Sequence, residues 1–118
     1  TEPNKAKVLH MIGNLESKNV IILDDMIDTA GSMINASETA IENGAKSVIS
    51  VATHGLFSDD AINKIMKSSI EKVIVANTVQ LPKEKQFKKL EIISVAPLFA
   101  NAIKNIHSGE SVSALFNV

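Results

Sequence analysis

Short apolar runs alternate with longer stretches of helical periodicity along this chain. The apolar runs predict strands, and the stretches between them repeat apolar residues at three- and four-residue spacing, which is typical of helices. The predicted strands span 6–12, 19–24, 47–53, 72–76 and 91–95, and the predicted helices span 32–43, a segment that begins after Ser58, and 97 to about 107. Strands that alternate with helices predict an α/β fold with a mostly parallel sheet. Right-handed crossovers are then expected to place helices on both faces.

Each predicted helix has an apolar stripe and recognisable ends. Gly44 and Gly109 follow the first and last helices, Ser58 is placed to cap the middle one, and Pro97 suits a first helical turn. The side chains expected to face the core are Met33, Ile34, Ser37, Ala40 and Ile41, then Ala61, Ile62, Ile65 and Met66, then Leu98, Phe99, Ala102, Ile103 and Ile106.

Composition narrows the class of protein. The 118 residues are 45% hydrophobic but only 3% aromatic, as expected for an aliphatic core around a parallel sheet. The net charge of −1 argues against nucleic-acid and membrane partners, and the absence of cysteine excludes disulfides. No apolar run approaches the roughly 20 residues that span a bilayer. Nothing at the start resembles a signal peptide, so we expect a cytoplasmic protein.

Residues 20–32 carry the clearest functional signal. Four apolar residues lead into Asp24 and Asp25, and then Asp28, a turn of small residues and a helix follow. This order is typical of a parallel strand that brings a ligand to a helix N-terminus. No Lys or Arg occurs between Asn19 and Ala45. A phosphate bound here would therefore be held by backbone N–H groups, with the carboxylates turned toward sugar hydroxyls or a divalent ion.

Other interpretations of this motif remain open from the residues alone. Asp28 or Ser32 could be a plain helix N-cap, and the two adjacent carboxylates could be solvated charges at a strand end. The motif lacks the lysine of a P-loop and the three glycines of a dinucleotide fingerprint. Because neighbouring strand residues point to opposite faces, Asp24 and Asp25 are not expected to make the same contact.

The string Asp-Asp-x-x-Asp-Thr-x-Gly-Ser resembles the phosphoribosyl-diphosphate loop of type I phosphoribosyltransferase-fold proteins. Within that fold the chain is most similar to the ribose-phosphate diphosphokinase (PRPP synthetase) family. Four further segments carry the resemblance: 8–13 (VLHMIG), 53–58 (THGLFS), Asn77-Thr78 and 109–116 (GESVSALF).

The resemblance implies transfer of the β,γ-diphosphoryl group of ATP to the 1-hydroxyl of ribose 5-phosphate, with Mg²⁺. It places Asp24 and Asp28 on ribose hydroxyls, and Asp25 in support of the loop or of a hydrated Mg²⁺. Thr29, Ala30, Gly31 and Ser32 would hold the 5-phosphate. Ser111 and Ser113 match serines that help bind a regulatory phosphate or ADP at a subunit interface in the family. Their alternative role is an ordinary polar face of an extended tail.

The family's ATP-binding, metal-binding and catalytic residues match no part of this chain and are expected upstream of Thr1. Residues 1–118 are then one C-terminal, ribose-5-phosphate-binding domain, truncated at its N-terminus and inactive by itself. The resemblance also implies a homo-oligomer, a hexamer in the family. His54 is expected near the site, as a ligand contact or as a structural hydrogen-bonding group, whereas His10 and His107 are expected to be structural or solvated. The lysine-rich run 83–89 is expected to be a solvated connection.

Three other functions compete with this one. A non-catalytic regulatory homologue would keep the sugar loop, and another phosphoribosyltransferase-fold protein would share it. A receiver-like signalling domain has a similar length and an acid pair after its first strand. It also needs an Asp after its third strand and a Lys after its fifth, but Ala76-Asn77 and Ala96-Pro97 stand there.

Overall fold

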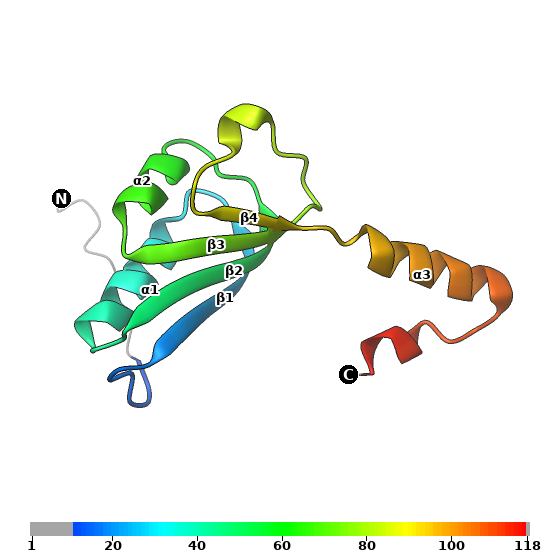
Figure 1. The fold of residues 1–118 in the computed structure, drawn as a ribbon, viewed down its shortest axis with the longest axis horizontal. Helices are drawn as coiled ribbons and strands as arrows, with labels where there is room; N and C mark the ends of the chain where they lie inside the picture. The colour runs from blue at the N-terminus through cyan, green and yellow to red at the C-terminus, as the bar shows by residue number, and fades with distance from the viewer. Residues whose placement is uncertain (1–10, 118) are drawn as a thin grey trace, which may run out of the picture.

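Four parallel strands form a single sheet in the computed structural model, which describes residues 11–117 (Figure 1). Each strand pairs with the next one along the chain, in the order β1-β2-β3-β4. The elements are β1 Asn19–Ile27, α1 Gly31–Glu42, β2 Ser47–Gly55, α2 Ala61–Lys67, β3 Ile70–Ala76, η1 Lys83–Lys85, β4 Leu90–Ile93, α3 Ala96–Ser108 and η2 Ser113–Phe116. The predicted parallel α/β fold is confirmed. Its strand order differs from the 2-1-3-4-5 order of flavodoxin-like and receiver folds.

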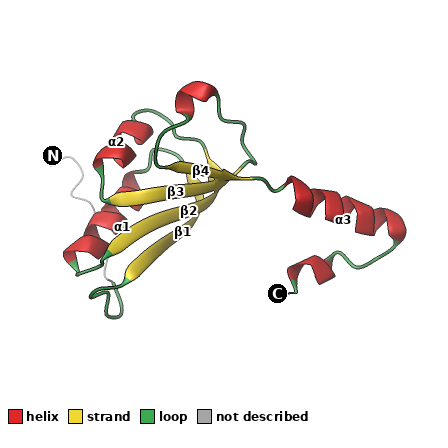
Figure 2. Ribbon diagram, viewed as in Figure 1, coloured by secondary structure: helices red, strands yellow, loops and turns green. Residues whose placement is uncertain are grey.

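The helices that pack on this sheet lie on one of its faces, not on both as predicted. A strand order that grows in one direction through right-handed crossovers brings successive helices to the same side. Helix α1 contacts β1, β2 and α2, and both helices lie behind the sheet in Figure 2. Along β2, Val48, Ser50 and Ala52 on that side are buried, whereas Ile49 and Val51 on the other are only partly covered.

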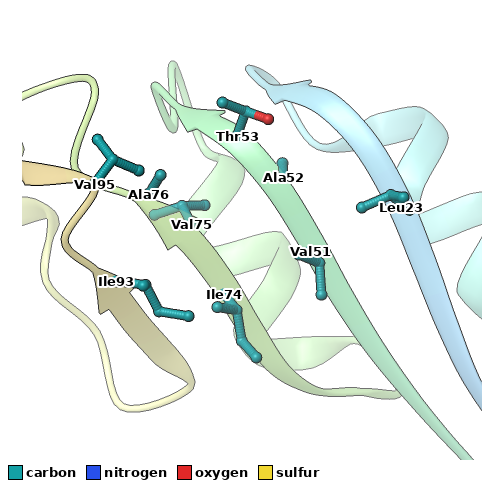
Figure 3. A pocket seen from close by; sticks show the side chains of 9 residues that line it. All are labelled: Leu23, Val51, Ala52, Thr53, Ile74, Val75, Ala76, Ile93 and Val95. Atoms are coloured by element: carbon teal, nitrogen blue, oxygen red, sulfur yellow. The ribbon is translucent and has the colours of Figure 1, made fainter. Parts of the chain in front are cut away.

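The second face of the sheet is apolar and open among the described residues. Figure 3 looks onto it: Leu23, Val51, Ile74 and Ile93 come from the four neighbouring strands. With five further residues they line a shallow hollow of about 260 Å³. Leu23 keeps 77% of its surface exposed and Ile93 keeps 53%.

The main core lies between the sheet and its two helices. Fully buried Phe57, Ile65, Ile70 and Val73 belong to it. The ring of Phe87 meets that of Phe57 edge to face, with centroids 5.2 Å apart and planes at 82°.

The connection 83–89 was predicted to be solvated, and this holds for Lys83, Glu84, Gln86 and Lys88 but is wrong for Lys85, Phe87 and Lys89. Besides Phe87, which packs on the core, Lys85 and Lys89 donate hydrogen bonds to backbone carbonyls of other segments. The sequence does not reveal these contacts, because a lysine can be solvated or can pack its aliphatic stem and donate from its ammonium group.

The helix boundaries follow the sequence closely, but some details differ. Ser58 does not cap α2: Asp59 adopts a left-handed φ of 52° and Asp60 takes the N-cap position without a side-chain cap bond. Helix α2 therefore begins three residues after Ser58, and no acidic residue lies in its first turn. Of its predicted stripe, Ala61 and Ile65 are buried and Met66 is 38% exposed.

Helix α3 has the predicted ends, with Pro97 in its first turn and Gly109 as a left-handed C-cap at φ 71°. Its apolar stripe does not face a core as predicted. The helix extends away from the sheet, its main contacts are with η2, and none of its residues is buried (Figure 1). The tail after it is a 3₁₀ turn and not the expected extended segment. Of the predicted strand 6–12, residues 6–10 lie outside the described residues, and 11–12 are not in a strand.

Candidate functional site

Asp24 and Asp25 lie inside β1, which runs three residues further than the sequence indicated. Parallel pairing with β2 continues to the end of the strand, where Met26 lies opposite His54 and Ile27 opposite Gly55. Both carboxylates are exposed, and the backbone N–H of Asp25 donates to Asp24 Oδ1 at 2.8 Å. This hydrogen bond holds one carboxylate oxygen of Asp24 against the backbone.

The turn between β1 and α1 ends at Ala30, which has a left-handed backbone with φ 66° and ψ 3°. Ala30 is the N-cap residue, and its carbonyl accepts the N–H of Ile34 at 3.0 Å. No side chain caps the helix. The interpretation of Asp28 or Ser32 as a plain N-cap is therefore excluded, because Asp28 precedes the cap and Ser32 lies within the helix.

The start of α1 presents backbone donors to the surroundings. The first N–H groups of any α-helix have no partner within the helix, and they carry the positive end of its dipole. In α1 these groups belong to Gly31, Ser32 and Met33. Thr29, Gly31 and Ser32 are exposed and Ala30 is buried, so the turn is anchored by Ala30 while its polar atoms remain accessible. Such a terminus can hold an anion without a side-chain cation.

Gly31 is not required by the fold. Its φ lies outside the left-handed region, and a Cβ added there would meet nothing within 4 Å. Glycine in a helix costs up to about 1 kcal/mol relative to alanine. A glycine that lowers the stability of the helix, and that no neighbouring atom requires, suits a position where a ligand must approach the backbone closely.

A second loop holds the turn in place. The N–H groups of Leu56 and Phe57 donate to Ile27 O at 2.8 and 3.3 Å, and Ser58 N–H donates to Asp28 O at 3.0 Å. Lys85 Nζ donates in turn to Leu56 O at 2.8 Å. The contact of Lys85 was not predictable, because nothing in the run 83–89 distinguishes this lysine from its neighbours.

Polar side chains line the carboxyl edge beyond β1 as well. His54 Nδ1 lies 2.7 Å from Thr78 Oγ1, which lies 3.1 Å from Thr53 O. Asn77 Nδ2 donates to Ser94 Oγ at 3.3 Å, and Asn77 Oδ1 accepts from Val95 N–H at 2.8 Å. Since the strands are parallel, the loops after β1, β2 and β3 leave from one edge, as the sequence indicated.

The acidic residues near the turn do not by themselves make a metal centre. Residues 11–117 contain no group of three His, Asp or Glu side chains that could hold an ion. Asp24, Asp25 and Asp28 therefore do not form a protein-only cage. Mg²⁺ commonly binds through one or two carboxylates plus substrate phosphates and waters, which leaves Asp25 as a candidate for a water-mediated contact.

Ser111 and Ser113 lie after α3, with their hydroxyl oxygens 2.7 Å apart. Asn105 Nδ2 donates to Ser111 O at 2.9 Å and ties this turn to the helix. The two serines are exposed and adjacent, as the sequence indicated, although the backbone there is not extended. His107 is exposed on α3, and His10 lies outside the described residues.

Among the helices of residues 11–117, none is long and apolar enough to cross a membrane.

Comparisons with known proteins cover nearly all of the chain. A family model described as "Phosphoribosyl synthetase-associated domain" matches residues 1–117. A ribose-phosphate pyrophosphokinase of Aquifex aeolicus is 50% identical over 115 residues, which is 98% of this chain and 37% of that protein. The Bacillus subtilis protein of the same name is 43% identical, over 98% of this chain and 36% of its own length.

A solved structure of a protein with a related name is also similar to this chain. The phosphoribosylpyrophosphate synthetase of Mycobacterium smegmatis superposes with a TM-score of 0.80 and 40% sequence identity, covering 83% of this chain and 33% of that one. The chain thus spans little more than a third of the length of the relatives it matches.

Proposed function

The chain belongs to the phosphoribosyl synthetase-associated domain family, and from this we propose that it is the C-terminal, sugar-phosphate-binding portion of a ribose-phosphate diphosphokinase. The whole protein would transfer the β,γ-diphosphoryl group of ATP to the 1-hydroxyl of ribose 5-phosphate. It would act in the cytoplasm as a homo-oligomer, with no nucleic-acid or membrane partner.

The observation that carries this proposal is the uncapped N-terminus of α1. The helix starts at a left-handed alanine, no side chain satisfies its first N–H groups, and an open glycine follows. These groups, together with Thr29 and Ala30 of the preceding turn, would hold the 5-phosphate. Each carboxylate of the motif can only accept hydrogen bonds when ionised, so Asp24 and Asp28 would accept them from ribose hydroxyls. Asp25 would support the loop or a hydrated Mg²⁺.

Phosphoryl transfer depends on positioning and on neutralising the charge of the transferred group. Mg²⁺ would supply part of that neutralisation when it enters with ATP. The residues of this chain supply acceptors and backbone donors on the sugar side. The groups that hold ATP would come from the part of the protein that precedes the matched region in its relatives, so this chain alone should bind the sugar phosphate without turnover. The serines at 111 and 113 would take a regulatory phosphate in the assembled protein.

Calorimetric titration with ribose 5-phosphate tests the proposal through Gly31. We expect Gly31→Ala to fold at least as stably as the wild type, because the added Cβ meets no atom and alanine favours the helix by up to about 1 kcal/mol. We expect the same variant to lose ribose 5-phosphate binding, because its methyl group occupies the approach to the backbone donors.

Glu42→Ala is the matched control, since it changes an exposed residue at the other end of α1 and should bind normally. A Gly31→Ala protein that binds ribose 5-phosphate with wild-type affinity would contradict the assignment of the phosphate to this turn.

A further inference from the structure

His54 and Thr78 form a short hydrogen-bonded chain at the carboxyl ends of β2 and β3. The hydroxyl oxygen of Thr78 lies 2.7 Å from His54 Nδ1 and 3.1 Å from the backbone carbonyl oxygen of Thr53. Thr78 follows β3, and His54 is the next-to-last residue of β2, so the chain joins the ends of two neighbouring strands.

The positions of the protons in these two hydrogen bonds follow by elimination. A carbonyl oxygen has no proton, so the contact between Thr78 and Thr53 O requires the single hydroxyl proton of Thr78. The hydroxyl oxygen must then accept its second hydrogen bond from His54, whose Nδ1 carries a proton. In a neutral imidazole the other nitrogen is unprotonated. If the Thr78 hydroxyl instead donated its proton to His54 Nδ1, the oxygens of Thr78 and Thr53 would lie 3.1 Å apart with no proton between them.

His54 lies next to the proposed sugar-phosphate loop. It is paired across the sheet with Met26, between the carboxylates and the turn. In the loop that follows it, the N–H groups of residues 56–58 donate to the carbonyls of Ile27 and Asp28. His54 itself is only partly buried. The loop after β2 and the turn before α1 are therefore joined by backbone hydrogen bonds, and His54 lies at the strand end just before that loop.

We infer that His54 is a substrate-contacting residue whose Nε2 accepts a hydrogen bond from a sugar hydroxyl. The inference rests on the proposed function and adds a residue to its site. An unprotonated nitrogen recognises a donor, and a ribose ring offers hydroxyl donors, whereas phosphate oxygens act chiefly as acceptors. Backbone N–H donors would then bind the phosphate of the ligand, and acceptors on Asp24, Asp28 and His54 would bind its sugar hydroxyls.

Two substitutions separate this role from a structural one. Asn places a side-chain amide near the Nδ1 position, so His54→Asn can keep the bond to Thr78 while it removes Nε2. Gln places its oxygen near the Nε2 position, so His54→Gln can keep the acceptor while it loses the bond to Thr78. We expect His54→Asn to weaken ribose 5-phosphate binding about tenfold, as for one lost hydrogen bond to a ligand, and His54→Gln to retain most of it.

Inorganic phosphate and a remote histidine supply the controls. Binding of inorganic phosphate alone should be the same in both variants and in the wild type, because His54 is assigned to the sugar. His107→Asn changes an exposed residue of α3 and should leave both affinities unchanged. Amide NMR spectra of each variant establish that it is folded.

If the wild type binds ribose 5-phosphate and His54→Asn binds it equally well, the role of His54 is wrong and the proposed function stands. If the wild type does not bind it, both are wrong. The ring ¹⁵N shifts of His54 in the free protein give a result independent of any ligand: a proton on Nε2 with none on Nδ1 would overturn the inference.

Discussion

Ala30 and Gly31 shape the start of α1 in different ways. Ala30 adopts a left-handed conformation that costs an L-residue roughly 1–2 kcal/mol, and its side chain is 5% exposed. Gly31 has an ordinary backbone and open space where a side chain would be. The motif in the sequence indicated a backbone cradle here. It did not indicate which residue makes the turn, because a left-handed alanine is set by the surrounding packing and not by its own preference.

Lys89 is a residue whose role only the fold reveals. Its ammonium donates to the carbonyls of Ile65 and Ser68, each at 3.0 Å, and so satisfies the C-terminal end of α2. We expect Lys89→Met to lower the free energy of unfolding by about 1–3 kcal/mol, because two part-buried carbonyls lose a charged donor. Lys88→Met alters an exposed neighbour and should change it by less than about 0.5 kcal/mol. Urea denaturation of the pair measures the difference, and equal stabilities would show that Lys89 does not stabilise α2.

Among the elements, α2 and α3 show what periodicity can and cannot predict. Both stripes were visible in the sequence at helical spacing. Periodicity identifies the apolar face of a helix but not the surface that covers it. Ile65 of α2 is fully buried, whereas Phe99, Ile103 and Ile106 of α3 are 60–69% exposed. The prediction of helices on both faces of the sheet was wrong for the same reason. The strand order determines which face each helix covers, and the apolar pattern does not reveal the strand order.

Matched truncations in these helices test the difference. We expect Ile65→Ala to destabilise the domain by about 2–5 kcal/mol, as a cavity in a packed core does. Ile103→Ala removes the same atoms from a side chain that is 67% exposed, and we expect a loss below about 0.5 kcal/mol. Thermal or urea unfolding of both variants provides the comparison. A large loss for Ile103→Ala would show that α3 packs against the domain in solution.

The whole molecule is more extended than its length requires. Its radius of gyration is 17.3 Å, against about 13.5 Å for a compact domain of this size. The difference reflects α3 and the tail, which extend from a sheet with two helices on one face (Figure 1). The fold class and the edge where the loops meet were predictable from the sequence, and the motif at 24–32 stays the predicted phosphate site. The contacts of His54, Lys85 and Lys89 were not, because they join segments more than 20 residues apart.

We propose that the backbone amides at the start of α1 bind the phosphate of ribose 5-phosphate. Amide ¹H–¹⁵N spectra of the wild-type chain, recorded during titration with ribose 5-phosphate, test it most directly. We predict saturable shifts that are largest for the amides of Gly31, Ser32 and Met33, with smaller ones at Asp24, Asp28 and His54. Saturable binding that leaves the amides of 31–33 unmoved, or no binding at all, would contradict the claim.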